Sequence, residues 1–333
     1  MTKRNLRTED KLAIDKLIKN QHSTIRGLAI LSNNQIILET YYGRKTKESK
    51  FNVASITKSV MSLLIGIAID KGYIQSVNER VMSYFPEYSF TDNNKQREQI
   101  TIKHLLTMTT PFPFQNMREP LTRIRRQPDW IEYGLKIMGN GGRIGTFKYS
   151  TTGAHILSAI LTKATKMSAR EFANLYLFKP LSIDDIPKYQ MTFDIEHVFG
   201  SKMKGWVSDP LGYNSGGWGL TLTLTEMTKI GQLCLADGAI NGLQLISKEW
   251  LKESVMAVKN SYGSYGYLWW IGDTDYEYMA TGSGGSIIYI NEKENIVITI
   301  ASTVISKHVD RKKLIDKILD MLKSEEEHSG CGR

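Results

Sequence analysis

Residues 52–59 read Asn-Val-Ala-Ser-Ile-Thr-Lys-Ser and open an apolar stretch. The pattern predicts a helix from Ser55 to about Lys71, with Gly72 in the position where a glycine commonly ends a helix. Ser55 and Lys58 are three residues apart, so they lie on one face of that helix about one turn from each other. A lysine that is removed from water can lose its proton and act as a base toward a neighbouring hydroxyl.

The same two residues also fit a plainer interpretation. Ser55 could simply cap the helix and Lys58 could be a solvated surface lysine, because Ser-x-x-Lys is a short and common pattern. Which interpretation holds depends on the rest of the chain.

The composition is that of an ordinary globular protein. The chain has 333 residues, of which 41% are hydrophobic and 23% charged, so we expect one or two domains. The N-terminus is polar and no apolar run reaches membrane-spanning length, which predicts a cytoplasmic protein without a membrane span. Two cysteines make no disulfide framework, which fits that compartment.

The formal net charge of +9 raises the question of nucleic acid or a membrane surface as a partner. The basic residues are scattered, however, and no basic stripe alternates with aromatic side chains. Their densest group lies in residues 118–126 and fits attraction of an anionic substrate better. We therefore expect a small-molecule ester, amide or peptide substrate and no nucleic acid, while the oligomeric state is not addressed by the sequence.

Strand patterns stand at both ends of the chain, with mostly helical patterns between them. Residues 27–31 and 35–42 predict a hairpin around a Ser-Asn-Asn turn. Further helices are predicted between the two strand regions, the last of them capped by Thr225. The predicted helices are 8–20, 101–108, 152–163, 168–177, 225–237 and 310–322, and the late strands are 265–271, 276–280, 286–290 and 295–301.

This order predicts an α+β fold with one antiparallel sheet that is built from both chain termini and flanked by helices. We expect residues 1–72 and 257–333 to form the sheet domain and residues 73–256 an inserted, mainly helical lobe, in a single unit overall. Residues 109–148 are rich in Pro, Gly and Arg and are predicted to be irregular, and a stretch this long is more typical of a wall or lid over a site than of a plain connection. A cleft between sheet and lobe is the default place for a site.

Several common kinds of site are excluded by the motifs. The six histidines are dispersed without ligand spacing and no His-Glu-x-x-His is present, so we expect no metal and no other cofactor. No Gly-x-Ser-x-Gly elbow, phosphate-binding loop or complete Gly-x-Gly-x-x-Gly occurs. These absences count against α/β-hydrolase, P-loop and Rossmann chemistry.

Three short motifs remain, in a fixed order. The first is Ser-Ile-Thr-Lys at 55–58, and the second is Phe-Lys-Tyr-Ser-Thr-Thr-Gly at 147–153, just before a predicted helix. The third is Ala-Thr-Gly-Ser-Gly-Gly-Ser at 280–286, just before a predicted strand. Taken singly, Tyr149 is more often a packed aromatic and a glycine run more often a tight turn.

With these motifs in this order, the chain resembles the serine β-lactamase and penicillin-binding-protein superfamily. It is most similar to the class C-like branch, which includes family VIII esterases, D-aminopeptidases and nylon-oligomer hydrolases. The likeness extends from about Gly27 to Ala301. It implies the β-lactamase-like α+β fold and favours the catalytic interpretation of the first motif.

The resemblance implies roles for the catalytic residues. Ser55 matches the nucleophile that forms an acyl-enzyme, and Lys58 matches the lysine that helps remove the hydroxyl proton. Tyr149 matches the tyrosine that shuttles protons to the leaving group, as a phenolate or as a relay partner. As a phenolate at neutral pH it would need nearby positive charge, for which Lys58 is the obvious source.

The resemblance also implies how the substrate is held. The backbone N–H groups of Ser55 and Ser286 would form the oxyanion hole, whose donors contribute several kcal/mol in the transition state. Gly284 and Gly285 would let the substrate lie close against the strand edge.

Two positions depart from the family pattern. Thr151 stands where β-lactamases usually have an asparagine, and Ser283-Gly284-Gly285 stands where they have Lys-Thr-Gly. The cation that would grip a substrate carboxylate is therefore absent from its usual place. An arginine from residues 118–126 could replace it, although nothing in the sequence shows that it does.

The sequence thus predicts a serine hydrolase that cleaves an ester or amide through a Ser55 acyl-enzyme, of the carboxylesterase, amidase or D-amino-acid peptidase type. One alternative is β-lactamase or penicillin-binding activity, which the missing cation weakens. Another is a non-catalytic binding or regulatory protein that has kept the fold.

Overall fold

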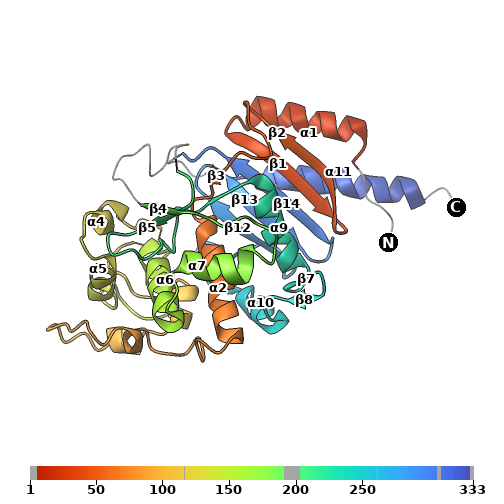
Figure 1. Cartoon of the computed structure of the whole chain (residues 1–333). Coiled ribbons are helices and arrows are strands. Elements are labelled where there is room, and N and C mark those ends of the chain that lie inside the picture. Colours follow the sequence, from red (N-terminus) through yellow and green to blue (C-terminus); the bar gives the residue numbers. More distant parts are fainter. Residues whose placement is uncertain (1–5, 116, 191–202, 261, 306–308, 331–333) are drawn as a thin grey trace.

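The computed structural model describes residues 6–330 except residues 116, 191–202, 261 and 306–308. Its centre is an eight-stranded antiparallel sheet in the order β2-β1-β14-β13-β12-β11-β10-β9 (Figure 1). The first and last long strands pair directly, which confirms the predicted α+β fold with a sheet built from both termini. The strands are β1 (Ile25–Ser32), β2 (Gln35–Tyr41), β9 (Val258–Asn260), β10 (Gly263–Tyr265), β11 (Trp270–Ile271), β12 (Glu277–Gly282), β13 (Ser286–Asn291) and β14 (Ile296–Ser302).

Helices cover both faces of this sheet and build the lobe beside it (Figure 1). Short strand pairs lie outside the central sheet: β3 (Phe51–Asn52) with β6 (Thr221–Leu222), β4 (Lys188–Gln190) with β5 (Trp206–Ser208), and β7 (Ala239–Ile240) with β8 (Leu243–Gln244). The helices are α1 (Thr8–Gln21), α2 (Ile56–Asp70), η1 (Val81–Tyr84), η2 (Arg97–Gln99), α3 (Ile102–Leu106), α4 (Leu121–Arg125), α5 (Trp130–Ile137), α6 (Thr151–Thr165), α7 (Ala169–Ala173), η3 (Asn174–Phe178), α9 (Leu224–Leu235), α10 (Lys248–Ser254) and α11 (Lys312–Gly330).

Alternation along the central strands divides the core into two layers. Successive side chains of a strand point to opposite faces. Leu28 and Ile30 of β1 belong to the core cluster that includes residues of α1 and α11, whereas Ala29 and Leu31 belong to the cluster that includes residues of α2 and α9. Both faces of the sheet are therefore covered, and β1 appears in the sequence as a nearly continuous apolar run. No helix in the described parts of the chain is long and apolar enough to cross a membrane.

Three sequence predictions of local structure were wrong. Residues 265–271 form two short strands, β10 and β11, that pair with each other around a turn in which Leu268 has a φ of +63°. Residues 109–148 contain α4 and α5 and are not wholly irregular. Thr223, not Thr225, caps α9, because its hydroxyl accepts a hydrogen bond from the Glu226 N–H.

The α2 helix runs through the middle of the molecule, between sheet and lobe. It contacts α6 and α7 on the lobe side and β12 and β13 on the sheet side. All its residues from Ile56 to Ala68 are buried, and a helix that is apolar nearly all round belongs in a core. The α9 helix lies in the range predicted for the lobe but packs on β1, β13 and β14. The predicted domain boundaries stay a prediction.

Gly66 lets α10 approach α2 closely. A methyl group at Gly66 would lie 2.4 Å from the Trp250 indole, which is buried. In Gly66→Ala, overpacking of about 1–3 kcal/mol opposes a helix-propensity gain of about 1 kcal/mol, so we expect a net loss of stability. The measurement is urea unfolding at pH 7.

The matched control is the same substitution in a Trp250→Leu background. The smaller side chain frees the space, so there Gly66→Ala should leave stability unchanged or raise it. Equal losses in both backgrounds would contradict the proposed contact.

Candidate active site

Ser55 lies at a tightly fixed point directly before α2. The strand pair β3–β6 leads into it, and the Val53 N–H donates to the Leu220 carbonyl over 3.0 Å. Ala54 has a φ of +47°, and its N–H donates to the Asn52 side chain over 2.9 Å. A residue with a Cβ in this left-handed region costs on the order of 1 kcal/mol, so the surrounding contacts must hold it there.

Lys58 is buried, with 1% of its surface exposed, and its amino group contacts three neutral oxygens. The Nζ atom lies 2.8 Å from the Gly217 carbonyl, 3.2 Å from the Thr151 hydroxyl and 3.2 Å from the Ser55 hydroxyl. Burial lowers the pKa of Lys58 to about 7, against the opposing effect of the Glu119 carboxylate. A substantial fraction of Lys58 is therefore neutral at neutral pH, beside the Ser55 hydroxyl.

Tyr149 lies on the loop before α6, with its ring stacked against aromatic side chains of the sheet. The centroid of the Tyr149 ring is 5.8 Å from that of Trp270 and 6.1 Å from that of Tyr265. Lys58 Nζ lies 4.8 Å from the Tyr149 centroid. Burial raises the pKa of Tyr149 to about 12, although its hydrogen bond with Ser55 lowers it. Tyr149 is thus a protonated phenol at neutral pH.

Glu119 is a site residue that the sequence analysis missed. Its carboxylate accepts hydrogen bonds from the N–H groups of Thr151 and, over 3.0 Å, Thr152 at the start of α6. Burial raises the pKa of Glu119, while these hydrogen bonds and the Lys58 charge lower it. No local pattern points to this contact, because Glu119 is more than thirty residues before the helix that it caps.

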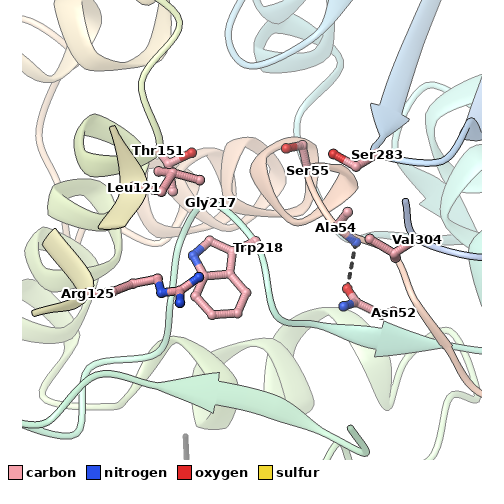
Figure 2. Close-up of a pocket in the computed structure, with 10 residues that line it drawn as sticks. All are labelled: Asn52, Ala54, Ser55, Leu121, Arg125, Thr151, Gly217, Trp218, Ser283 and Val304. Atoms are coloured by element: carbon pink, nitrogen blue, oxygen red, sulfur yellow. Dashed lines mark hydrogen bonds between the residues drawn. The ribbon is translucent and has the colours of Figure 1, made fainter. Parts of the chain in front are cut away.

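A pocket opens beside Ser55, and its ten lining residues are labelled in Figure 2. It holds about 470 Å³ of empty space, part of it open to solvent. The wall includes Leu121 and Arg125 of α4, which confirms that the 109–148 stretch contributes a wall to a site. Thr151, Gly217 and Trp218 form another part of the wall. In the part of the chain that the structure describes, no group of three or more His, Cys, Asp or Glu side chains could hold a metal ion.

The third motif meets Ser55 through Ser283, which lies in the turn between β12 and β13. Ser283 lines the pocket and its side chain points toward Ser55 (Figure 2). The adjacent Gly282 passes close to the segment just before Ser55, since a Cβ there would be 2.4 Å from the Val53 carbonyl oxygen. Ser286 lies further on, at the start of β13, outside the pocket lining, and its hydroxyl accepts from the Ser302 N–H over 3.0 Å. Of these two serines, Ser283 and not Ser286 shares the pocket wall with Ser55.

Gly284 and Gly285 are needed for packing in this turn. Both have a positive φ, and a Cβ would clash with the Thr303 carbonyl at Gly284 and with the Arg311 guanidinium at Gly285. Neither glycine lines the pocket, and the expectation that they let a substrate lie close against the strand edge stays a prediction. Arg311, which the sequence analysis missed, is buried and donates to both glycine carbonyls over 3.2 and 3.4 Å.

The family model described as Beta-lactamase matches residues 14–323. The chain belongs to the beta-lactamase family. Among curated proteins, the 6-aminohexanoate-dimer hydrolase of Paenarthrobacter ureafaciens is 20% identical over 303 residues, which are 82% of this chain and 71% of the relative.

Solved structures of low sequence identity share the fold. A class C beta-lactamase has a TM-score of 0.71 at 15% identity, covering 94% of this chain and 96% of the other. EstCE1, a hydrolase with promiscuous acyltransferase activity, has a TM-score of 0.70 at 14% identity, covering 94% and 97%. The predicted family resemblance is confirmed.

The structure brings together Ser55, Lys58, Tyr149 and Thr151, the four residues that the first two motifs of the family pattern predicted. The residue that approaches them from the third motif is Ser283, which carries no charge. A cation nevertheless reaches the pocket of this beta-lactamase family member from the lobe, because Arg125 belongs to its wall.

The buried amino group makes stability depend on pH in a defined direction. The pKa of Lys58 is about 7 in the folded protein and 10.5 in the unfolded chain. Between these values the unfolded chain binds more protons, so the Lys58 contribution to stability rises with pH. We expect Lys58→Met to gain stability relative to wild type on going from pH 10 to pH 7, by on the order of 4 kcal/mol.

The measurement is urea unfolding of wild type and variant at both pH values. Lys16→Met, at an exposed position on α1, is the control and should show the same difference from wild type at each pH. A pH-independent difference for Lys58→Met would mean that Lys58 keeps its ordinary pKa in the folded protein.

Proposed function

We propose that this beta-lactamase family member is a serine hydrolase that cleaves an ester or amide through a covalent Ser55 acyl-enzyme. The observation that carries the proposal is the contact of 3.2 Å between Lys58 Nζ and Ser55 Oγ, at a lysine with a pKa of about 7. Ser55 is also part of the pocket wall, so a substrate carbonyl can reach it. A buried amine, an adjacent hydroxyl and an open pocket are what nucleophilic catalysis needs.

Lys58 in its neutral form has two N–H donors and one lone pair. The Gly217 carbonyl and the Thr151 hydroxyl can accept the two N–H groups, which leaves the lone pair for the Ser55 O–H. As Ser55 Oγ bonds to the substrate carbonyl carbon, its proton passes to Lys58. Thr151 thus orients the base, where the family pattern usually has asparagine.

The oxyanion that forms on the substrate carbonyl needs preorganised donors. We assign this role to the backbone N–H groups of Ser55 and Ser283, in place of the Ser286 N–H, because Ser283 is the third-motif residue beside Ser55. Such donors stabilise a transition state by about 3 kcal/mol each. The turn that carries Ser283 is fixed from behind by Arg311.

Tyr149 completes the proton path to the leaving group. Its pKa of about 12 favours the relay role over the phenolate role: the phenol gives its proton to the departing oxygen or nitrogen and takes one from the Lys58 ammonium. The carbon–leaving-group bond breaks and the acyl group stays on Ser55. Water then attacks the acyl-enzyme, and its proton returns through the same groups.

The substrate class is proposed as small esters, short amides or D-amino-acid peptides. The similarity to a 6-aminohexanoate-dimer hydrolase and to the hydrolase EstCE1 supports ester and amide cleavage. β-Lactam hydrolysis or penicillin binding is less supported, because Ser283 carries no charge. A non-catalytic binding role is the remaining alternative. The cytoplasmic location and the lack of a nucleic-acid partner stay predictions.

Covalent labelling separates an enzyme from a binding protein. We expect a fluorophosphonate probe to add one adduct on Ser55, seen by mass spectrometry, and Ser55→Ala to lose both the adduct and p-nitrophenyl butyrate hydrolysis. Ser83→Ala, at an exposed serine of η1, should keep both. Hydrolysis by Ser55→Ala at the wild-type rate would overturn the assignment, and no adduct with this probe or with a penicillin would favour the binding protein.

Glu119 should tune the base without touching the substrate. Its carboxylate raises the pKa of Lys58, so Glu119→Gln should lower that pKa. Because neutral Lys58 is the active form, the acid limb of the pH profile of kcat/KM should move to lower pH. Glu132→Gln, at an exposed position of α5, should leave the limb in place. An unmoved limb in Glu119→Gln would show that the Glu119 charge does not act on Lys58.

A further inference from the structure

The pocket beside Ser55 carries one feature that the catalytic groups do not use. Arg125 projects from α4 toward the Trp218 indole, and both side chains belong to the pocket wall (Figure 2). Arg125 is half-buried and forms part of the pocket wall. Arginine combines a planar face that stacks on aromatic rings with N–H donors that match a carboxylate.

The charge of the pocket comes from this residue. Of the ten lining residues, all within the described part of the chain, Arg125 alone is charged, and the others are apolar or neutral polar. The carboxylate of Glu119, from the same segment, is turned to the N–H groups at the start of α6 and is not part of the lining. A ligand anion in the pocket would therefore meet a cation, and none of the described lining residues is acidic.

The position of the pocket tells which part of a substrate it receives. The leaving group must lie near Tyr149, which donates the proton to it in the proposed reaction. Tyr149 is not among the lining residues, whereas Ser55 and Ser283, which hold the reacting carbonyl, are. The pocket therefore receives the acyl part of the substrate.

We propose that the enzyme selects substrates whose acyl group ends in a carboxylate, bound by Arg125 beside Trp218. The chemical class is half-esters and half-amides of short dicarboxylic acids. Leu121, Trp218 and Val304 give the methylene chain an apolar wall, and Arg125 gives its far end a charge-assisted contact. This inference rests on the proposed hydrolase function, which supplies the direction of the acyl group.

A matched pair of substrates tests the charge alone. One is the p-nitrophenyl half-ester of adipic acid, and the other is the same ester with its free carboxylate replaced by a carboxamide. We expect wild type to prefer the acid in kcat/KM, and Arg125→Met to lower the acid-to-amide ratio by about tenfold to a hundredfold. Arg125→Lys should keep part of the ratio, because it keeps the charge but not the planar donor pair.

Arg126→Met is the matched control, since Arg126 is exposed and adjacent in sequence but is not part of the pocket wall. It should keep the wild-type ratio, which separates a local contact from the general attraction of a basic protein. An unchanged ratio in Arg125→Met, or equal losses in both arginine variants, would overturn the proposal.

A binding measurement keeps this test independent of turnover. Calorimetric titration of Ser55→Ala with adipate and with its monoamide should show tighter binding of adipate, and Arg125→Met added to that protein should remove the difference. If neither ester is hydrolysed by wild type while adipate binding still depends on Arg125, the hydrolase function fails and the carboxylate site stands. If the esters are hydrolysed without any dependence on Arg125, the function stands and the carboxylate site fails.

Discussion

The burial of one amino group constrains the whole arrangement around α2. Lys58 has exchanged water for three neutral oxygens that come from its own helix, from the start of α6 and from the loop before β6. These segments converge only if sheet and lobe are closely packed. At Gly217 a Cβ would lie 2.6 Å from the Thr151 side chain, so a glycine is needed where the loop presses on α6. The contacts of a single amine thus fix how the two halves meet.

The site contains several features that lower the stability of the fold, and the packing of the core offsets this loss. A lysine is buried, Ala54 has a left-handed backbone, and Glu119 is placed close to the reacting groups. Sites of this kind are commonly less stable than the rest of their fold, because reactive groups need environments that favour the less common protonation state. Here burial moves the pKa values of two neighbouring groups in opposite directions, to about 7 for Lys58 and about 12 for Tyr149. That separation suits one group to take a proton and the other to pass one on.

The sequence was sufficient to predict features that depend on the order of motifs and on the periodicity of apolar residues. The paired β1 and β14, the buried α2 and the three motifs follow from local patterns of apolar and special residues. Local patterns do not predict contacts between distant segments. Two such contacts are those of Glu119 with the start of α6 and of Arg311 with the turn after Ser283. The sequence could not show that Ser283 would be the third-motif residue beside Ser55, because a glycine run does not reveal the residue at which β12 ends. That point is fixed by the pairing of β12 with β13, in which Gly282 lies opposite Ser286.

Arg311 also joins both ends of the chain to the active site. Its guanidinium contacts His22 over 2.9 Å and Thr24 over 2.5 Å, ahead of β1, while the residue itself precedes α11. The turn that presents Ser283 is therefore held by residues that come before the first strand and after the last one. A shortened protein that stopped after β14 would retain Ser55, Lys58 and Tyr149, yet its third motif would have lost Arg311. One that began at β1 would keep Arg311 but lose His22 and Thr24, which contact the guanidinium. Residues that precede and follow the central sheet in the sequence thus help to position a turn that lines the pocket.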